Sequence, residues 1–251
     1  MKKLLLVLFF IAISFDGFSQ FFTEKTGNKL QKGITKYEGY FTFYYDDNKD
    51  KIFLQIEDLD TEFLYVRSLS EGVGSNDLGL DRGQLGDGVV VRFKKVGNKI
   101  LMIQPNQDYR AITNNREEKQ SVKEAFAKSV LHGFVIKETK KGVHLVDATS
   151  FFMRDAHGVS KTLARNKQGN YSLDKSKSAF NLERTKAFPK NVEVRHTLTY
   201  TGTKLPSNGR LTGTLTLEMN QSFVILPDVP MQPRVFDARV GYFSLSQTDY
   251  G

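Results

Sequence analysis

Four histidines are the side chains in this sequence best suited to zinc binding or to general acid–base catalysis. They are His132, His144, His157 and His196. A zinc site on a helix needs a second His or a Glu three or four residues further on, and none of the four is followed by one. His196 alternates in phase with a strand, and His157 lies in a turn where it would need distant partners. The spacing therefore argues against a zinc site within this chain.

An acidic run is the second group that could bind a metal. Asp46, Asn48 and Asp50 imitate the first three ligands of a calcium loop, and Glu57 falls at the twelfth position. The sixth position of such a loop should be Gly and the flanks should be helices, but here it is Lys51 between strand-like segments. A hairpin turn explains the same residues, because Asp and Asn tolerate turn conformations. We predict a turn, with calcium binding as the alternative.

A glycine-rich stretch at residues 72–88 is the third candidate. Its Gly-Val-Gly-Ser start is not followed by the Gly-Lys-Ser/Thr of a phosphate-binding loop, and Asp77 and Asp81 would repel a phosphate. We expect a long flexible loop. Its Leu-Asp-Arg-Gly-Gln segment, with Asp81 and Arg82, could border a cleft, because long loops on rigid sheets often do so.

No nucleophile or acid–base pair emerges from the remaining residues. The sequence has no Gly-x-Ser-x-Gly motif. Its densest carboxylates, at residues 57–62, fall in a turn where solvent would leave their acidity unshifted, whereas general acid–base work needs burial. We therefore predict no catalytic residue and no cofactor in this chain.

The N-terminus has the three parts of a secretory signal peptide. Lys2 and Lys3 precede an apolar run at residues 4–13, and Gly17 and Ser19 supply small residues before the expected cleavage site. The run is about ten residues long, whereas a membrane span needs roughly 20. We predict a secreted or periplasmic protein cleaved near Ser19, with no transmembrane segment; a retained membrane anchor is the alternative.

Charge gives a weaker indication of partners. The chain has 36 Lys and Arg against 28 Asp and Glu, and no Cys, so packing alone must hold an exported fold. The basic residues are spread along the chain as pairs, whereas nucleic-acid-binding proteins cluster them with aromatic residues on one face. We expect a solvated basic surface and no nucleic acid. Adhesion to anionic glycans or lipid headgroups is the alternative.

Hydrophobic periodicity predicts an α+β fold, mainly antiparallel, arranged as sandwich or meander-like sheets. One clear helix is expected near residues 117–130, because Val122, Phe126 and Val130 follow a helical spacing. Residues 160–165 suit a short helix, and residues 180–188 are ambiguous. After the signal peptide at residues 1–19 we expect two β-rich units, residues 20–116 and 117–251. The expected strands are residues 37–45, 51–56, 62–69, 89–94, 99–104, 133–138, 142–147, 191–200, 211–218 and 222–226.

Three phrases carry a resemblance to a known family. They are Phe-Leu-Tyr-Val at residues 63–66 with Ser-Leu-Ser-x-Gly-Val-Gly-Ser at 68–75; Leu-Asp-Arg-Gly-Gln at 80–84; and Leu-Pro at 226–227 with Met-x-Pro-Arg-x-x-Asp-x-Arg-Val-Gly-Tyr-Phe at 231–243. In this order behind a signal peptide, they resemble the N-terminal region of large secreted bacterial zinc-dependent metalloproteases. In those proteins, domains of unknown function precede a metzincin-like protease domain. The resemblance covers residues 36–251.

That resemblance implies zinc in the full-length family protein but none here. The family's His-Glu-x-x-His-x-x-Gly-x-x-His helix is absent from this sequence, so no zinc ligand can be carried over and the chain looks truncated. Its implied partners are the missing C-terminal protease domain and a protein or peptide substrate. An interface kept for such a domain would be an exposed apolar patch.

The last phrase has two interpretations. Arg234, Asp237 and Arg239 could form a salt-bridged strand edge, with Tyr242 and Phe243 as core aromatics. Alternatively, the three charged residues border the substrate cleft of the missing protease domain. In that case they would position other groups and perform no chemistry themselves.

The sequence thus favours a non-catalytic N-terminal part of a secreted zinc metalloprotease, with an accessory or pro-domain-like role. The main alternative is a stand-alone secreted β-rich binding module for glycan or protein, suggested by the aromatic-rich residues 37–45. Exposed aromatics there would stack on sugars, whereas buried ones would fill a core. A hydrolase whose residues are dispersed over the fold is the third possibility.

Overall fold

The computed structural model describes residues 32–74, 77–202, 213–241 and 243–251. The expected signal peptide and its cleavage site lie outside these residues, as does Tyr242. Strand accounts for 44% of the described residues and helix for about 12%, which confirms an α+β fold dominated by antiparallel strands. Within the described residues, no helix has the length and apolar character needed to cross a membrane.

The regular elements follow one another along the chain as a series of strands interrupted by short helices. The strands are β1 Ile34–Tyr37, β2 Phe43–Asp46, β3 Lys51–Ile56, β4 Glu62–Glu71, β5 Val89–Val96, β6 Lys99–Gln104, β7 Tyr109–Arg110, β8 Ser129–Lys140, β9 Val143–Asp147, β10 Tyr171–Leu173, β11 Ala179–Phe180, β12 Lys186–Phe188, β13 Asn191–Gly202, β14 Thr214–Ile225 and β15 Thr248–Asp249. The helices are α1 Arg116–Ala125, α2 Thr149–Phe152, α3 Val159–Arg165 and the 3₁₀ turn η3 Lys175–Lys177.

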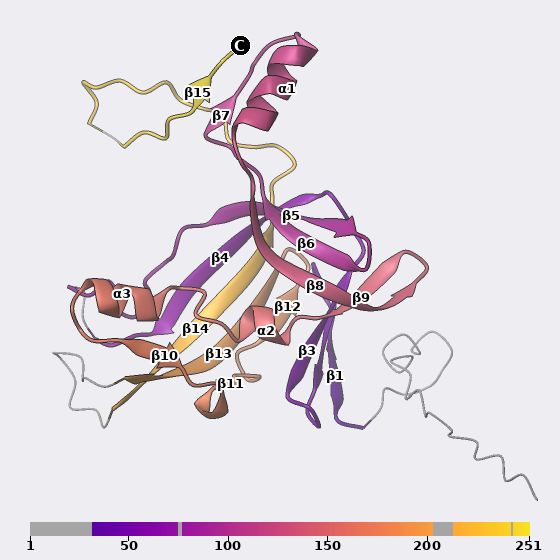
Figure 1. Ribbon diagram of the computed structural model, residues 1–251, viewed down its shortest axis with the longest axis vertical. Helices are drawn as coiled ribbons and strands as arrows, with labels where there is room; N and C mark the ends of the chain where they lie inside the picture. Colours follow the sequence, from indigo (N-terminus) through magenta and orange to yellow (C-terminus); the bar gives the residue numbers. More distant parts are fainter. Residues whose placement is uncertain (1–31, 75–76, 203–212, 242) are drawn as a thin grey trace, which may run out of the picture.

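One 13-stranded sheet contains all the strands except β7 and β15 (Figure 1). Its order is β1-β2-β3-β9-β8-β6-β5-β4-β14-β13-β10, with β11 and β12 also paired to β13. The long strand β8 pairs with β6 through its first half and with β9 through its second half. Strands from before and after residue 117 therefore alternate within the same sheet.

The sheet curls so that its two ends meet. The backbone N–H of Tyr40 donates to the carbonyl of Phe188 at 2.8 Å, and the rings of Tyr45 and Phe180 lie 6.1 Å apart. Gly39 permits this approach, because a Cβ there would lie 2.6 Å from the Phe188 carbonyl oxygen. The curled sheet thereby encloses one continuous apolar cluster.

Aromatic rings form the centre of that cluster. Phe63 lies 5.1 Å from Phe41, 5.1 Å from Phe93 and 5.2 Å from Phe223, and two of these contacts are edge-to-face. Phe151 of α2 extends the group, 5.9 Å from Phe223. Such pairs contribute about 0.5–1.5 kcal/mol beyond the area that they bury. Rings from β4, β5, β14 and α2 therefore hold one core together.

The aromatic-rich residues 37–45 show both a confirmed and a corrected prediction. Four of these aromatic side chains are buried: Phe41, Phe43, Tyr44 and Tyr45. They therefore fill the core, which was the alternative to stacking on sugars. The expected continuous strand is wrong, because residues 38–42 leave the sheet between β1 and β2. They do so to reach Phe188, as the Tyr40 hydrogen bond shows. An alternating pattern of aromatic residues does not show that the chain leaves the sheet to contact a distant strand.

The predicted helix is present but shorter than its periodicity indicated. It runs from Arg116 to Ala125, and Phe126 already has extended backbone angles, φ −115° and ψ 118°. Val130 instead lies in β8, opposite Ile103 of β6. Pairing with the sheet therefore overrides the helical spacing over the last five residues. Two strands were predicted at residues 211–218 and 222–226; the described residues form a single strand there, from residue 214 to 225. The short helix expected near residues 160–165 is confirmed by α3.

A chain of polar side chains crosses the core beside the aromatic rings. The hydroxyl of Tyr65 donates to Gln221 Oε1 at 2.6 Å and accepts from Arg154 Nη2 at 3.1 Å. Gln221 Nε2 donates to the carbonyl of Phe152 at 2.8 Å and lies 3.3 Å from Nε2 of His196. Buried polar groups are costly unless they are hydrogen-bonded, so this chain fixes how β4, β13, β14 and α2 pack.

Replacing His196 by Gln is expected to flatten the acid side of the stability profile. Burial lowers the pKa of His196 to about 4, against about 6.5 in an unfolded chain. The unfolded chain therefore takes up this proton first, and stability is lost as the pH falls from 6.5 towards 4. The full effect is about 3 kcal/mol. The measurement is the free energy of unfolding against pH for both proteins; equal slopes between pH 6.5 and 4 would contradict this account.

Candidate functional site

The candidate calcium residues form a turn between β2 and β3. Asp46 is buried, accepts from the backbone of Asn48 and pairs with Lys49 at 3.3 Å. Asp50 accepts from the hydroxyl of Tyr45 at 2.8 Å. Glu57 follows the far end of β3, about 20 Å from the turn at roughly 3.3 Å per residue. The structure uses the turn carboxylates for local bonds and does not bring Glu57 to them.

The histidines are dispersed over the fold. Across the described ranges, which include all four, no three His, Asp or Glu side chains gather where they could hold a metal ion. His196 belongs to the buried polar chain, and Nδ1 of His144 lies 2.8 Å from the hydroxyl of Thr139. Burial lowers the pKa of His132, and the nearby Arg154 lowers it further. The described residues therefore do not fit the zinc that the sequence resemblance implies for the full-length protein.

The loop containing Asp81 and Arg82 runs along the edge of β4. Gly83 donates to the carbonyl of Leu69 at 2.8 Å, and Leu69 donates back to Gln84 at 2.9 Å. This pairing covers the part of β4 that β5 does not reach. The side chain of Arg82 is exposed. The loop protects a sheet edge, which accounts for its position without a cleft.

The C-terminal charged residues lie elsewhere. Asp237 accepts from Nε and Nη2 of Arg239, at 3.0 and 2.6 Å, within an irregular turn. The bonds from Arg239 lower the pKa of Asp237. Arg234 is exposed. The pair thus forms locally, but no strand edge exists there among the described residues, and the prediction of Phe243 as a core residue is wrong because its side chain is fully exposed.

A small lobe stands apart from the curled sheet (Figure 1). It consists of residues 105–128, which connect β6 to β8 and include β7 and α1, together with the C-terminal strand β15. β15 lies parallel to β7. No residue of α1 is buried, so the helix depends on contacts within the lobe for its position.

The C-terminal strand holds the lobe by a set of direct bonds. Thr248 donates to the carbonyl of Asp108 at 2.8 Å, and Tyr250 donates to that of Arg110 at 2.9 Å. The carboxylate of Asp249 accepts from the backbone of Ile112 at 2.9 Å and pairs with Arg110 at 3.2 Å. Side-chain and backbone bonds together attach the last residues of the described chain to residues 108–112.

Aromatic stacking connects that strand pair to the helix. The rings of Tyr109 and Phe126 are parallel, 3.8 Å apart, and Tyr250 lies 5.6 Å from Phe126. At the other end of α1, Asn115 accepts from the backbone of Glu117 at 2.9 Å, a regular N-cap. The stack and the cap fix the two ends of a helix that has no buried face.

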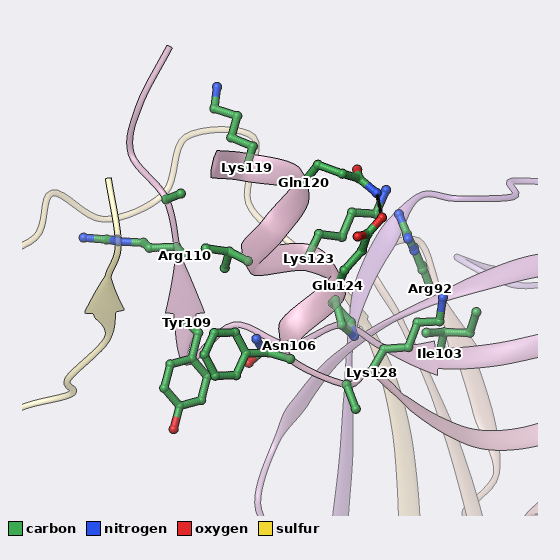
Figure 2. A pocket seen from close by; sticks show the side chains of 15 residues that line it. Arg92, Ile103, Asn106, Tyr109, Arg110, Lys119, Gln120, Lys123, Glu124 and Lys128 are labelled. Atoms are coloured by element: carbon green, nitrogen blue, oxygen red, sulfur yellow. Dashed lines mark hydrogen bonds between the residues drawn. The ribbon is translucent and has the colours of Figure 1, made fainter. Parts of the chain in front are cut away.

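Between this lobe and the sheet lies a groove of about 700 Å³, which we call the α1 groove (Figure 2). Its lining residues come from β5, β6, β7, α1 and the connecting segments: Arg92, Ile103, Pro105, Asn106, Tyr109, Arg110, Ala111, Lys119, Gln120, Val122, Lys123, Glu124, Phe126, Ala127 and Lys128. Five of them are cationic and one is anionic. The groove is therefore a basic site with apolar side chains between its charges.

The cations differ in where they point. Figure 2 shows Arg92 of β5 and Lys123 of α1 directed towards the same space from opposite walls, with Lys128 at its base, whereas Lys119 and Arg110 point away. Arg92 Nε is buried without a hydrogen bond among the described residues, and its nearest carboxylate, Asp60, is 4.0 Å away. The side chains of Arg92, Lys123 and Lys128 are therefore the cations directed into the groove.

The sequence contained only part of the signal for this site. Lys123 and Lys128 both fall within the helix predicted at residues 117–130. Arg92 comes from a strand about 30 residues earlier, and only the sheet order brings it opposite α1. A charge count along the chain therefore suggested a diffuse basic surface and missed the groove.

Comparison with known families gives two matches. A model described as domain of unknown function DUF5117 matches residues 83–251, and one described as domain of unknown function DUF5118 matches residues 24–72. No curated protein and no solved structure matches. The first match covers the α1 groove, the lobe and the C-terminal segment.

Replacing Tyr109 by Ala is expected to loosen α1 while leaving the sheet intact. The change removes a stacked pair worth about 1 kcal/mol from a helix with no buried residue. Amide hydrogen exchange in α1 should therefore accelerate about fivefold, read residue by residue by mass spectrometry or NMR.

Amides of β13 and β14 in the same sample provide the internal control and should not change. Tyr109→Phe keeps the ring and should behave like the unaltered protein. Unchanged exchange in α1, or acceleration in both strands as well, would show that the stack does not hold the helix.

Proposed function

This chain belongs to the DUF5117 family, and we propose that it is a non-catalytic docking module for another protein domain. The observation that carries the proposal is the exposure of apolar side chains after β14. Val229, Met231, Val240, Phe243 and Leu245 all have exposed fractions between 65% and 105%. Large exposed apolar surface is typical of interaction sites in soluble proteins.

The concentration of these side chains in one segment strengthens the argument. Single apolar residues on a surface need no explanation, but these five fall within residues 229–245, whose described members form no helix or strand. Figure 1 shows this yellow segment looping out beside β15, away from the curled sheet. The core is already filled by its own aromatic rings. The segment is therefore available to a partner.

The sequence resemblance suggests which partner to expect. The most specific of its phrases, at residues 231–243, coincides with this exposed segment. We propose that the segment docks a zinc-dependent protease domain in an exported protein, with the metal bound by that domain. In this role the chain supports folding, inhibition or substrate presentation and supplies no catalytic residue.

The polar side chains of the body have structural roles that fit this proposal. Asp155 accepts from the backbone of Val159 at 2.7 Å, from that of Ser160 at 2.9 Å and from the hydroxyl of Tyr200 at 2.9 Å. Burial, with the neighbouring Asp155, raises the pKa of Tyr200. A carboxylate held by three donors caps α3 and is not placed to act as a base.

The alternative of a glycan-binding module loses its original support. It relied on exposed aromatics at residues 37–45, but Tyr44 is buried and its hydroxyl accepts from Gln55 at 3.1 Å. A protein partner remains the better fit, because the exposed side chains are mainly aliphatic. Sugar recognition relies on aromatic faces, and Phe243 is the only aromatic residue among the five.

Replacing Met231, Phe243 and Leu245 together by Ser is expected to reduce surface hydrophobicity without loss of stability. The unaltered chain should bind a hydrophobic fluorescent dye and self-associate, and the triple variant should lose at least about half of the dye signal. Its melting temperature should change by less than about 3 °C, because exposed side chains contribute little to stability.

A matched control changes two exposed polar neighbours, Asp228→Ser and Gln232→Ser, and should leave dye binding as it is. Size-exclusion chromatography follows the oligomeric state in parallel. A clean monomer with no dye signal before substitution, or a large fall in melting temperature after it, would rule out an open docking surface.

A further inference from the structure

The α1 groove has an excess of positive charge directed inward. Lys123 and Lys128 have no ion pair among the described residues, and Arg92 forms only a long one, 4.0 Å from Asp60. The one acidic side chain in the lining, Glu124, accepts a hydrogen bond from Gln120. The groove therefore has five cationic side chains against one anionic side chain, a balance of charge that favours an anionic ligand.

Its size excludes a single small ion as the natural occupant. A volume of about 700 Å³ lies within the range of roughly 300–1,000 Å³ that holds a drug-sized ligand. The cations also come from opposite walls, with Arg92 on β5 and Lys123 on α1 (Figure 2). A ligand that meets both must be extended and must carry more than one negative group.

The apolar part of the lining further limits the chemical class of ligand that fits the groove. Ile103, Pro105, Val122 and Phe126 lie between the charged positions. A sulfated glycan would leave this surface without a complement, since its negative groups repeat along a polar backbone. A nucleic acid would stack its bases on aromatic faces, but the ring of Phe126 is already stacked on that of Tyr109. A peptide that alternates carboxylates with aliphatic or aromatic side chains matches both kinds of lining.

Arg92 is suited to recognising a carboxylate. Its guanidinium presents several N–H donors in a planar fork that matches a carboxylate geometrically. Its side chain is 34% exposed while its Nε is buried, so a ligand carboxylate would meet the terminal nitrogens. Lys123 and Lys128 add charge without a fixed geometry.

We propose that the α1 groove binds an acidic peptide segment of a partner protein, whose carboxylates meet Arg92, Lys123 and Lys128. An aliphatic or aromatic side chain of the same segment packs on Val122 and Phe126. This inference is based on the groove alone and not on the exposed segment after β14. The exposed segment leads into β15 of the lobe that forms one wall of the groove, so one partner can occupy both.

Fluorescence anisotropy with a labelled peptide tests the proposal. The probe is a short peptide alternating Glu or Asp with Leu, compared with the same peptide carrying Gln and Asn in place of its acids. The acidic peptide should bind to the full chain and the amide peptide should bind at least about tenfold more weakly. Binding should also weaken as salt is raised, because part of it is electrostatic.

The variants Arg92→Gln, Lys123→Gln and Lys128→Gln should each weaken binding about two- to fivefold, as expected for partly exposed ion pairs. Arg116→Gln is the matched control. It removes the same charge from the same helix but from an exposed side chain that does not line the groove, so it should change binding less than twofold. Circular dichroism confirms that each variant is folded.

Three results would overturn the proposal. The first is equal binding of the acidic and the amide peptide by the unaltered chain, which needs no variant to interpret. The second is an equal loss of affinity in Arg116→Gln and Lys123→Gln, which would indicate general charge attraction. The third is tighter binding of single-stranded DNA or heparin than of the peptide at the same salt concentration, which would assign the groove to a phosphate or sulfate polymer.

The triple Ser variant of Met231, Phe243 and Leu245 separates this site from the proposed docking segment. Because those residues do not line the α1 groove, the variant should bind the acidic peptide with unchanged affinity. A loss of peptide binding in that variant would show that the segment itself binds the peptide, and the groove proposal would fail.

Discussion

The antiparallel pairing of β4 with β14 is the constraint on which the rest of the structure depends. It joins residues 63–71 to residues 218–225, about 150 positions apart in the sequence. The pairing brings Phe63 against Phe223 and allows Tyr65 to donate to Gln221. From β4 the sheet continues through β5, β6 and β8, and from β14 it continues through β13. Without this pair the two ends of the curled sheet could not enclose one core.

Because the core is closed in this way, the candidate binding sites lie at the periphery of the fold. Tyr65, Gln221 and the carbonyl of Phe152 are hydrogen-bonded in the core, the loop after β4 covers the edge of that strand, and the candidate calcium turn is held by its own bonds. The two places available to a ligand or partner are the α1 groove beside the lobe and the exposed segment that follows β14. Both are attached through β15, which holds residues 108–112. The same short strand therefore positions the groove wall and ends the apolar segment.

The sequence predicted those features that depend on local patterns. Alternation identified β13 and both hairpins, and helical spacing identified α1 to within a turn at its start. It failed where a distant strand decides the outcome: Val130 pairs with Ile103 and so leaves the helix, and Gly39 approaches Phe188 and so leaves the sheet. The α1 groove was missed for the same reason, since Arg92 and Lys123 meet only through tertiary structure.

The most direct test of the docking role is carbene footprinting of the protein in a native extract of the cells that produce it. The same labelling is then applied to the purified chain. If a partner covers the segment after β14, Met231, Phe243 and Leu245 should be labelled several-fold less in the native extract than in isolation, with labelling of the exposed loop at Leu85 unchanged. Equal labelling of the segment in both samples would contradict the account, because it would show apolar surface that no partner covers.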